Sequence, residues 1–142
     1  KTVSARDLAT MACVFAKGGY HPHNNKKIIS KETANYVIRA MHRSGLYEYS
    51  GTWAAEVGYV AAKSGVAGGI IIILKGIGGL AIVSPPLDAI GNSVRGIKAG
   101  KIITKGIYNI KDAETKFCPP PPKTKKRRRT TKKRRAATKK RR

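Results

Sequence analysis

The apolar run at residues 70–74 constrains this chain more than any other feature of its sequence. Four consecutive isoleucines followed by a leucine favour a buried β-strand, because β-branched side chains suit a pleated sheet. The uninterrupted apolar stretch 65–74 ends at Lys75 and is too short to cross a bilayer as a helix. A second apolar run, 80–83, follows a glycine-rich loop, so the two runs predict an antiparallel hairpin.

Residues 63–69 read Lys-Ser-Gly-Val-Ala-Gly-Gly and predict a glycine-bearing turn that feeds the first strand. Three glycines in five positions keep side chains away from one spot, and Lys63 and Ser64 place an ammonium and a hydroxyl beside it. Such a spot can present backbone N–H groups to a small anionic or carbonyl ligand. The alternative is a hairpin edge that needs glycine only for a bulge.

Helical spacing of apolar residues flanks the hairpin on both sides. Ser4 and Asp7 form a capping-box pattern, and Ser30 is a second cap candidate. Trp53 lies in an expected short helix, and we expect its side chain in the hydrophobic core rather than stacked on a ligand. The four expected helices begin near residues 4, 30, 51 and 92 and end near residues 18, 45, 57 and 110. Helices packed on a small antiparallel hairpin make the fold class α+β.

The charge of the chain is concentrated at its C-terminal end. Lys and Arg total 30 against 7 acidic residues, a net charge of +23, and residues 123–142 alone hold 14 basic residues and no acid. We expect a folded body over 1–118, a stiff proline spacer at 119–122 and a disordered tail over 123–142. The tail is expected to bind nucleic acid or another polyanion without sequence preference, or to serve as a nuclear-targeting or membrane-docking segment. The alternative is a solvated extension with no role.

The cysteines and histidines indicate neither a disulfide framework nor a metal site. Cys13 and Cys118 are the two cysteines, with no C-x-x-C spacing, so we expect free thiols in a reducing compartment. The three histidines have no acidic residue or cysteine at ligand spacing, so we expect loop and surface histidines and no metal. No signal peptide is visible. We expect a cytoplasmic protein, with the mitochondrion and the nucleus as alternatives.

Four blocks of sequence, taken together, resemble the C-terminal part of the serine-dependent glutaminases. They read Gly-Leu-Tyr-Glu-Tyr-Ser-Gly-Thr-Trp-Ala at 45–54, Lys-Ser-Gly-Val-Ala-Gly-Gly at 63–69, Ser-Pro-Pro-Leu-Asp at 84–88 and Gly-Asn-Ser-Val at 91–94. The resemblance covers about residues 3–97. It implies part of a domain like the β-lactamases and penicillin-binding proteins. The implied reaction converts L-glutamine and water into glutamate and ammonia without a cofactor. Subunits associate in the family, so the resemblance also implies a homo-oligomer.

The resemblance also implies site residues. Tyr47 matches the tyrosine that sits against the nucleophile and handles protons, since a phenol near a lysine ammonium can carry a proton. Val66 matches the residue whose main chain binds the substrate and supplies an oxyanion N–H. Lys63, Ser64 and Gly65 resemble the K-[ST]-G element that helps to hold the pocket. The alternatives are a tyrosine packed at a hairpin corner and an ordinary strand valine.

The chain departs from the family pattern in ways that affect function. None of its serines (4, 30, 44, 50, 64, 84 and 93) has a lysine three residues on, so the S-x-x-K nucleophile segment is missing. We therefore expect the chain to be inactive alone, and the alternative is a polyanion-binding protein with a degenerate enzyme body. One additional residue before Lys63 must be absorbed by a bulge or loop. A domain cut to its last third should leave 70–74 exposed on one face.

Overall fold

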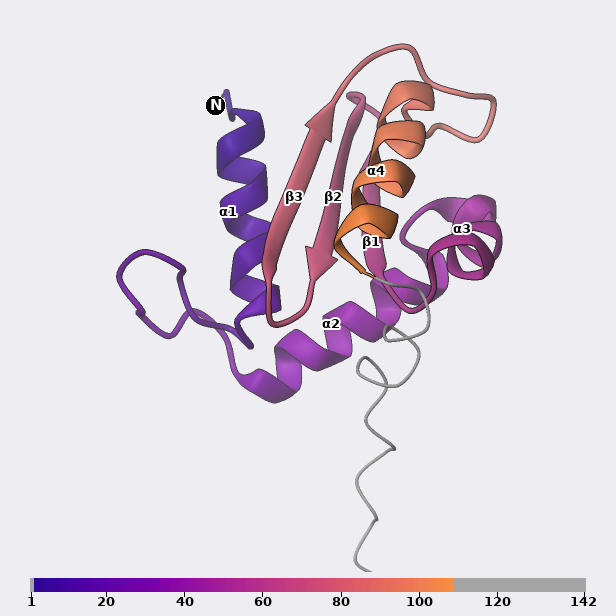
Figure 1. Ribbon diagram of the computed structural model, residues 1–142. Coiled ribbons are helices and arrows are strands. Elements are labelled where there is room, and N and C mark those ends of the chain that lie inside the picture. Colours follow the sequence, from indigo (N-terminus) through magenta and orange to yellow (C-terminus); the bar gives the residue numbers. More distant parts are fainter. Residues whose placement is uncertain (1, 109–142) are drawn as a thin grey trace, which may run out of the picture.

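A three-stranded antiparallel sheet separates two helical layers in the computed structural model, which describes residues 2–108 (Figure 1). The predicted α+β class, with helices packed on a small antiparallel sheet, is confirmed. The proline spacer 119–122, the basic tail 123–142, Cys118 and the expected helix end at Ile110 lie outside the described residues. The elements are α1 (Ala5–Ala16), α2 (Lys31–Ser44), the 3-10 turn η1 (Tyr47–Tyr49), α3 (Ser50–Val57), β1 (Ala61–Gly65), β2 (Gly69–Leu74), β3 (Gly78–Val83) and α4 (Val94–Ile107).

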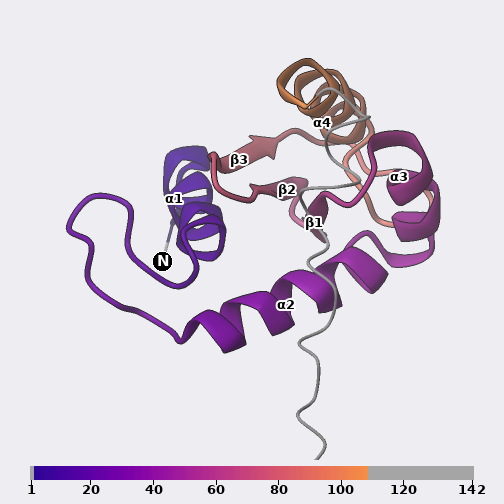
Figure 2. The same cartoon turned by 60° about the horizontal axis from the view of Figure 1, so that its bottom comes forward.

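The central strand β2 is buried on both faces. Ile70, Ile72 and Leu74 pack in one apolar cluster with residues of α3 and α4. Ile71 and Ile73 alternate to the other face and pack with residues of α1 and α2. These two helices lie on one side of the sheet, opposite α3 and α4 (Figure 2). Each of the five side chains is at most 9% exposed. The expected exposure of 70–74 is therefore wrong, because helices from both ends of the chain cover the two faces of the strand.

The sheet contains a third strand that the sequence did not predict. Residues of β1 pair with β2 in antiparallel register, with Lys63 opposite Ile71 and Ser64 opposite Ile70. Lys63 and Ser64 thus lie in a strand, and the turn is limited to residues 66–68. The sequence Ala-Ala-Lys-Ser-Gly carries no apolar alternation, so this strand forms because the isoleucine strand beside it supplies hydrogen-bonding partners.

Helix starts follow the predicted caps. The Ser4 hydroxyl accepts from Asp7 N (3.2 Å), and the Asp7 carboxylate accepts from Ser4 N (2.8 Å), which completes the capping box. Ser30 caps α2 in the same way through Thr33 N (3.0 Å). The last helix starts two residues later than expected because the hydroxyl of Ser93, rather than Asn92, accepts from the first turn.

α1 lies directly on β3 at a glycine. A Cβ on Gly79 would stand 2.4 Å from Ala9 O and 2.5 Å from Cys13 N, so only glycine allows this approach. Gly79 N also donates to Cys13 Sγ (3.0 Å), which places Cys13 on the side of its helix that faces the sheet. Among residues 2–108, no helix combines the length and apolarity needed to span a membrane.

Candidate functional site

Tyr47 occupies an unusual backbone conformation between α2 and α3. Its φ is +56°, in the left-handed region that L-residues other than Asn and Asp seldom enter. Such a conformation costs free energy and persists only where the surrounding structure imposes it. It is the first residue of the short 3-10 turn η1, and its side chain is half-buried. The strain lies at the residue that the sequence marked as catalytic.

Local hydrogen bonds impose this conformation. The Ser50 hydroxyl accepts from Leu46 N (3.0 Å) and donates to Tyr47 O (2.7 Å), so one buried side chain closes the turn from both ends. Upstream, Ser64 N in β1 donates to Gly45 O (2.9 Å). A Cβ on Gly45 would stand 1.8 Å from Ala62 O, so the close contact between the end of α2 and β1 requires glycine.

The structure brings Lys63 to Tyr47 although they are far apart in sequence. The Lys63 Nζ lies 4.8 Å from the centroid of the Tyr47 ring, within the range of a cation–π contact. The same ammonium donates to Ser64 O at the outer edge of β1 (2.5 Å). A cation and a phenol therefore share one corner of the sheet.

Val66 lies in the exposed turn between β1 and β2. The turn is closed by Gly68 N donating to Gly65 O (2.9 Å), and the Val66 side chain is 75% exposed. Within residues 2–108 the Val66 N–H makes no hydrogen bond, so it is available to an external acceptor. In the same described part of the chain, no hydrogen bond or ring contact connects Val66 with Tyr47.

Ser64 differs from the other candidates because its hydroxyl is buried. The residue is 2% exposed, and its Oγ has no hydrogen-bond partner among the described residues. Its place opposite Ile70 puts it on the sheet face that α3 and α4 cover. The hydroxyl is therefore not presented beside the turn, and its predicted part in substrate binding stays a prediction.

A short loop, residues 58–60, leads from α3 into β1 at the point where the sequence has one residue more than the family pattern. Val60 N donates to Gly58 O (2.8 Å), and Trp53 Nε1 donates to Val60 O (2.8 Å), which fixes the chain as it enters the strand. Tyr59 is pushed outward and stacks on His42, with ring centroids 4.5 Å apart. Burial lowers the pKa of His42.

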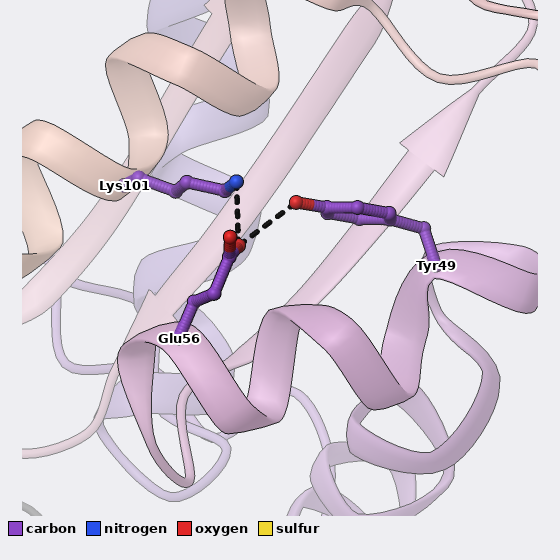
Figure 3. Close-up of polar contacts among 3 residues, drawn as sticks. All are labelled: Tyr49, Glu56 and Lys101. Carbon is purple, nitrogen blue, oxygen red and sulfur yellow. Dashed lines mark hydrogen bonds and ion pairs between the residues drawn. The ribbon is translucent and has the colours of Figure 1, made fainter.

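A polar cluster that the sequence analysis missed connects the turn around Tyr47, residues 45–50, to the last helix. We call this segment the Tyr47 turn. Lys101 of α4 and Tyr49 of η1 both point at Glu56 of α3 (Figure 3). Glu56 accepts from the Tyr49 hydroxyl (2.8 Å) and pairs with the Lys101 ammonium (2.5 Å). The bond from Lys101, followed by that from Tyr49, lowers the pKa of Glu56, and Glu56 in turn raises the pKa of Lys101. No local pattern could have revealed this cluster, because its third member is 45 residues away from Glu56.

Asn92 is a second contributor that the sequence analysis left without a role. It is 0% exposed and donates from Nδ2 to Leu46 O (3.2 Å), directly before Tyr47. The Gly-Asn-Ser block was recognised as part of the resemblance, but nothing in the sequence connects it with residue 46. In the described part of the chain, no three His, Cys, Asp or Glu side chains gather as a metal site.

Comparison with known proteins gives a consistent result. The family model described as Glutaminase matches residues 1–109. A glutaminase of Colwellia psychrerythraea is 45% identical over 106 residues, which is 75% of this chain and 34% of that protein. Glutaminase 1 of Escherichia coli K12 is 42% identical over 105 residues, 73% of this chain and 34% of that protein. The chain thus spans about a third of the length of the curated relatives it matches.

Solved structures agree with the sequence relatives. A probable glutaminase superposes with a TM-score of 0.71 at 40% identity, over 74% of this chain and 34% of that chain. A probable glutaminase from Bacillus subtilis, complexed with 6-diazo-5-oxo-L-norleucine, gives a TM-score of 0.70 at 34% identity, over 73% of this chain and 36% of that chain. A further structure is the covalent complex formed when the B. subtilis protein reacts with that compound. The chain belongs to the glutaminase family.

Proposed function

We propose that this chain supplies the proton-transfer and oxyanion part of a site that hydrolyses L-glutamine to glutamate and ammonia. The observation that carries the proposal is the conformation of Tyr47. Its backbone is held in the left-handed region, and its phenol ring lies beside the Lys63 ammonium. A strained residue that its surroundings hold in place is typical of a functional site.

In this proposal, Tyr47 moves protons and Val66 stabilises charge. A serine nucleophile from the family's S-x-x-K segment attacks the side-chain amide of glutamine, and the Tyr47 phenol carries the proton from the nucleophile towards the departing ammonia. The free Val66 N–H binds the oxygen on which negative charge develops. Covalent capture of the B. subtilis glutaminase by 6-diazo-5-oxo-L-norleucine supports a nucleophilic mechanism for the family.

In this proposal, the end of β1 supports the site through Lys63, Ser64 and Gly65. The Lys63 ammonium stands over the Tyr47 ring, and β1 carries both Lys63 and the turn that presents Val66. The strand therefore sets the distance between the proton carrier and the oxyanion donor. Ser64 contributes through its backbone, because its N–H fixes Gly45 next to the Tyr47 turn.

The 142 residues contain no S-x-x-K pair, so we propose that the nucleophile comes from sequence outside them. The isolated chain is expected not to release ammonia from glutamine. A complete site can be assembled in a hybrid protein, called the chimaera, in which residues 1–109 replace the 106-residue matched segment of the C. psychrerythraea glutaminase. The chimaera supplies the S-x-x-K segment of the relative together with Tyr47 and Val66 of this chain.

The test of the proposed roles is a pair of tyrosine variants in the chimaera. Tyr47→Phe removes one hydroxyl and is expected to lower kcat by about 100-fold or more, the usual contribution of a positioned proton carrier. Tyr36→Phe is the matched control, because Tyr36 is 68% exposed on α2 and its loss should leave kcat unchanged. A Tyr47→Phe chimaera as active as the control would refute the role of Tyr47.

Three further properties are proposed on the family resemblance or on the sequence alone. We propose that subunits associate, as in the family, and that the protein acts in the cytoplasm. We propose separately that the tail 123–142 binds polyanions, because its basic residues are unopposed by acids. No contact of the described residues bears on the tail, so this proposal rests on composition.

A further inference from the structure

The Tyr47 turn is held from inside and from outside its own segment. Ser50 and the N–H of Tyr49 bond to it from within. Within residues 2–108, Asn92 provides the one side chain outside the segment 45–50 that bonds to the backbone of Leu46 or Tyr47. Its amide reaches across 46 residues of sequence to a carbonyl adjacent to the strained residue. An external contact of this kind fixes a turn relative to the sheet rather than only closing it.

Asn92 is itself fixed by the loop that carries it. One oxygen of Asp88, Oδ1, accepts from the N–H groups of Ile90, Gly91 and Asn92 at 3.0, 2.9 and 2.8 Å. Asp88 N donates back to Asn92 O (2.8 Å), which closes the loop. The next residue, Ser93, caps α4, so the loop is anchored to a helix that packs on the sheet.

The same loop also lies near the Tyr47 ring. A Cβ built on Gly91 would stand 3.6 Å from Tyr47 Cε2, within van der Waals range. The loop therefore approaches Tyr47 at two points, with Gly91 near the ring and Asn92 bonded to the carbonyl that precedes Tyr47. Lys63 of β1 approaches the ring as well, so two segments outside the turn lie beside it.

The hydrogen bonds of Asn92 indicate that its Nδ2–H donor, rather than its Oδ1 acceptor, is the group that the fold uses. The residue is fully buried, yet its Oδ1 has no partner among the described residues. A buried acceptor without a partner costs free energy, and an apolar residue of similar shape would avoid that cost. The Asn92 amide N–H group, which an apolar residue lacks, is the donor from outside the segment 45–50 that bonds to Leu46 O among the described residues.

We propose that Asn92 is a positioning residue for Tyr47, whose amide sets the direction of the phenol by holding the backbone of Leu46. Asp88 serves the same end by holding the loop. Neither side chain reaches the reacting atoms in this account. The inference rests on the proposed function in one respect only, namely that the Tyr47 phenol is the group that must be aimed.

The first test uses the full 142-residue chain and does not depend on catalysis. The six tyrosines are replaced by 3-fluorotyrosine, and the loss of one fluorine NMR signal in Tyr47→Phe assigns the Tyr47 resonance. In Asn92→Ala, that resonance is expected to move towards the position of free 3-fluorotyrosine by more than its linewidth. Thr104→Val is the matched control and should leave the resonance in place, because Thr104 is a buried residue of α4 whose hydroxyl has no hydrogen-bond partner among the described residues.

Asp88→Ala is the second variant, because its position outside the core keeps the test open if Asn92→Ala does not fold. It should move the Tyr47 resonance in the same direction. An unmoved resonance in a folded Asn92→Ala, or in Asp88→Ala where the former does not fold, overturns the inference. An equal movement in Thr104→Val also overturns it, because the effect would then be general loosening of the fold.

The second test separates this inference from the proposed function. In the chimaera, Asn92→Ala is expected to lower kcat and leave KM nearly unchanged, because it misdirects a proton carrier without removing a substrate contact. If Tyr47→Phe leaves kcat unchanged while the fluorine signal of Tyr47 still moves in Asn92→Ala, the proposed function fails and the positioning role stands. If Tyr47→Phe lowers kcat but Asn92→Ala neither moves the signal nor changes kcat, the positioning role fails alone.

Discussion

The left-handed backbone at Tyr47 predicts that glycine will be more stable than alanine at this position. Both Tyr47→Ala and Tyr47→Gly lose the ring and its contacts with Lys63, so the difference between them isolates the backbone. A φ of +56° costs an L-residue about 1–2 kcal/mol, and glycine avoids that cost. Glycine loses about 0.5–1 kcal/mol to its larger unfolded-state entropy. The net expectation is that Tyr47→Gly exceeds Tyr47→Ala in stability by about 0.75 kcal/mol, the midpoint of a range of about 0–1.5 kcal/mol.

The assay is urea unfolding of the purified chain, followed by the fluorescence of Trp53, with the slope m compared between variants. Ala55→Gly is the matched control, because Ala55 is exposed in the ordinary helix α3, where the same exchange should cost about 1 kcal/mol. The sign of the alanine-to-glycine change should therefore reverse between positions 47 and 55. If Tyr47→Ala is as stable as Tyr47→Gly or more so, the backbone is not held in the left-handed region and the argument for Tyr47 fails.

Three further predictions address the contact between Gly45 and β1, the Glu56 cluster and the basic tail. Gly45→Ala should cost about 3 kcal/mol or more in urea unfolding, because its Cβ would stand 1.8 Å from Ala62 O; a near-neutral result would contradict the close contact. The pKa of Glu56 is lowered, so its bond to Lys101 stabilises the fold at pH values above the unfolded pKa of 4.5. This stabilisation is lost as the pH falls through the folded pKa. Thermal melts between about pH 6 and pH 3 should therefore show a smaller loss of stability in Glu56→Gln than in the wild type, and parallel curves would contradict this. Deleting 119–142 should abolish salt-sensitive binding to heparin or DNA, measured as the slope of log K against log salt, whereas a truncated chain with the same slope would show that the tail is not the binding segment.

The sequence was sufficient to predict features that depend on local pattern. The isoleucine run indicated a buried strand, and Ser4 and Ser30 indicated helix starts, because apolar periodicity and capping act within a few residues. The strand β1 could not be predicted in this way. Its Ala-Ala-Lys-Ser-Gly sequence has no strand signal of its own, and it becomes a strand through pairing with β2.

The candidate site shows the same division. Tyr47 and Val66 are candidates by resemblance, and the structure adds the left-handed backbone of Tyr47 and the exposed turn position of Val66. The Asn92 amide on Leu46 O and the Glu56 cluster depend on residues 7 to 46 positions apart. Sequence pattern carries little information about such contacts, because tertiary packing rather than local propensity brings the partners together. The expected exposure of 70–74 was wrong for the same reason, since α1 and α4 cover that strand from opposite ends of the chain.

The most direct test of the central claim is ammonia release from L-glutamine by the unmutated chimaera, with the 142-residue chain alone as its control. We expect that the chimaera hydrolyses glutamine and that the chain alone does not, because residues 1–109 provide Tyr47 and Val66 but no S-x-x-K nucleophile. A folded chimaera that releases no ammonia would contradict the claim that this chain carries a functional part of a glutaminase site. Glutamine hydrolysis by the chain alone would contradict the claim that its nucleophile comes from elsewhere.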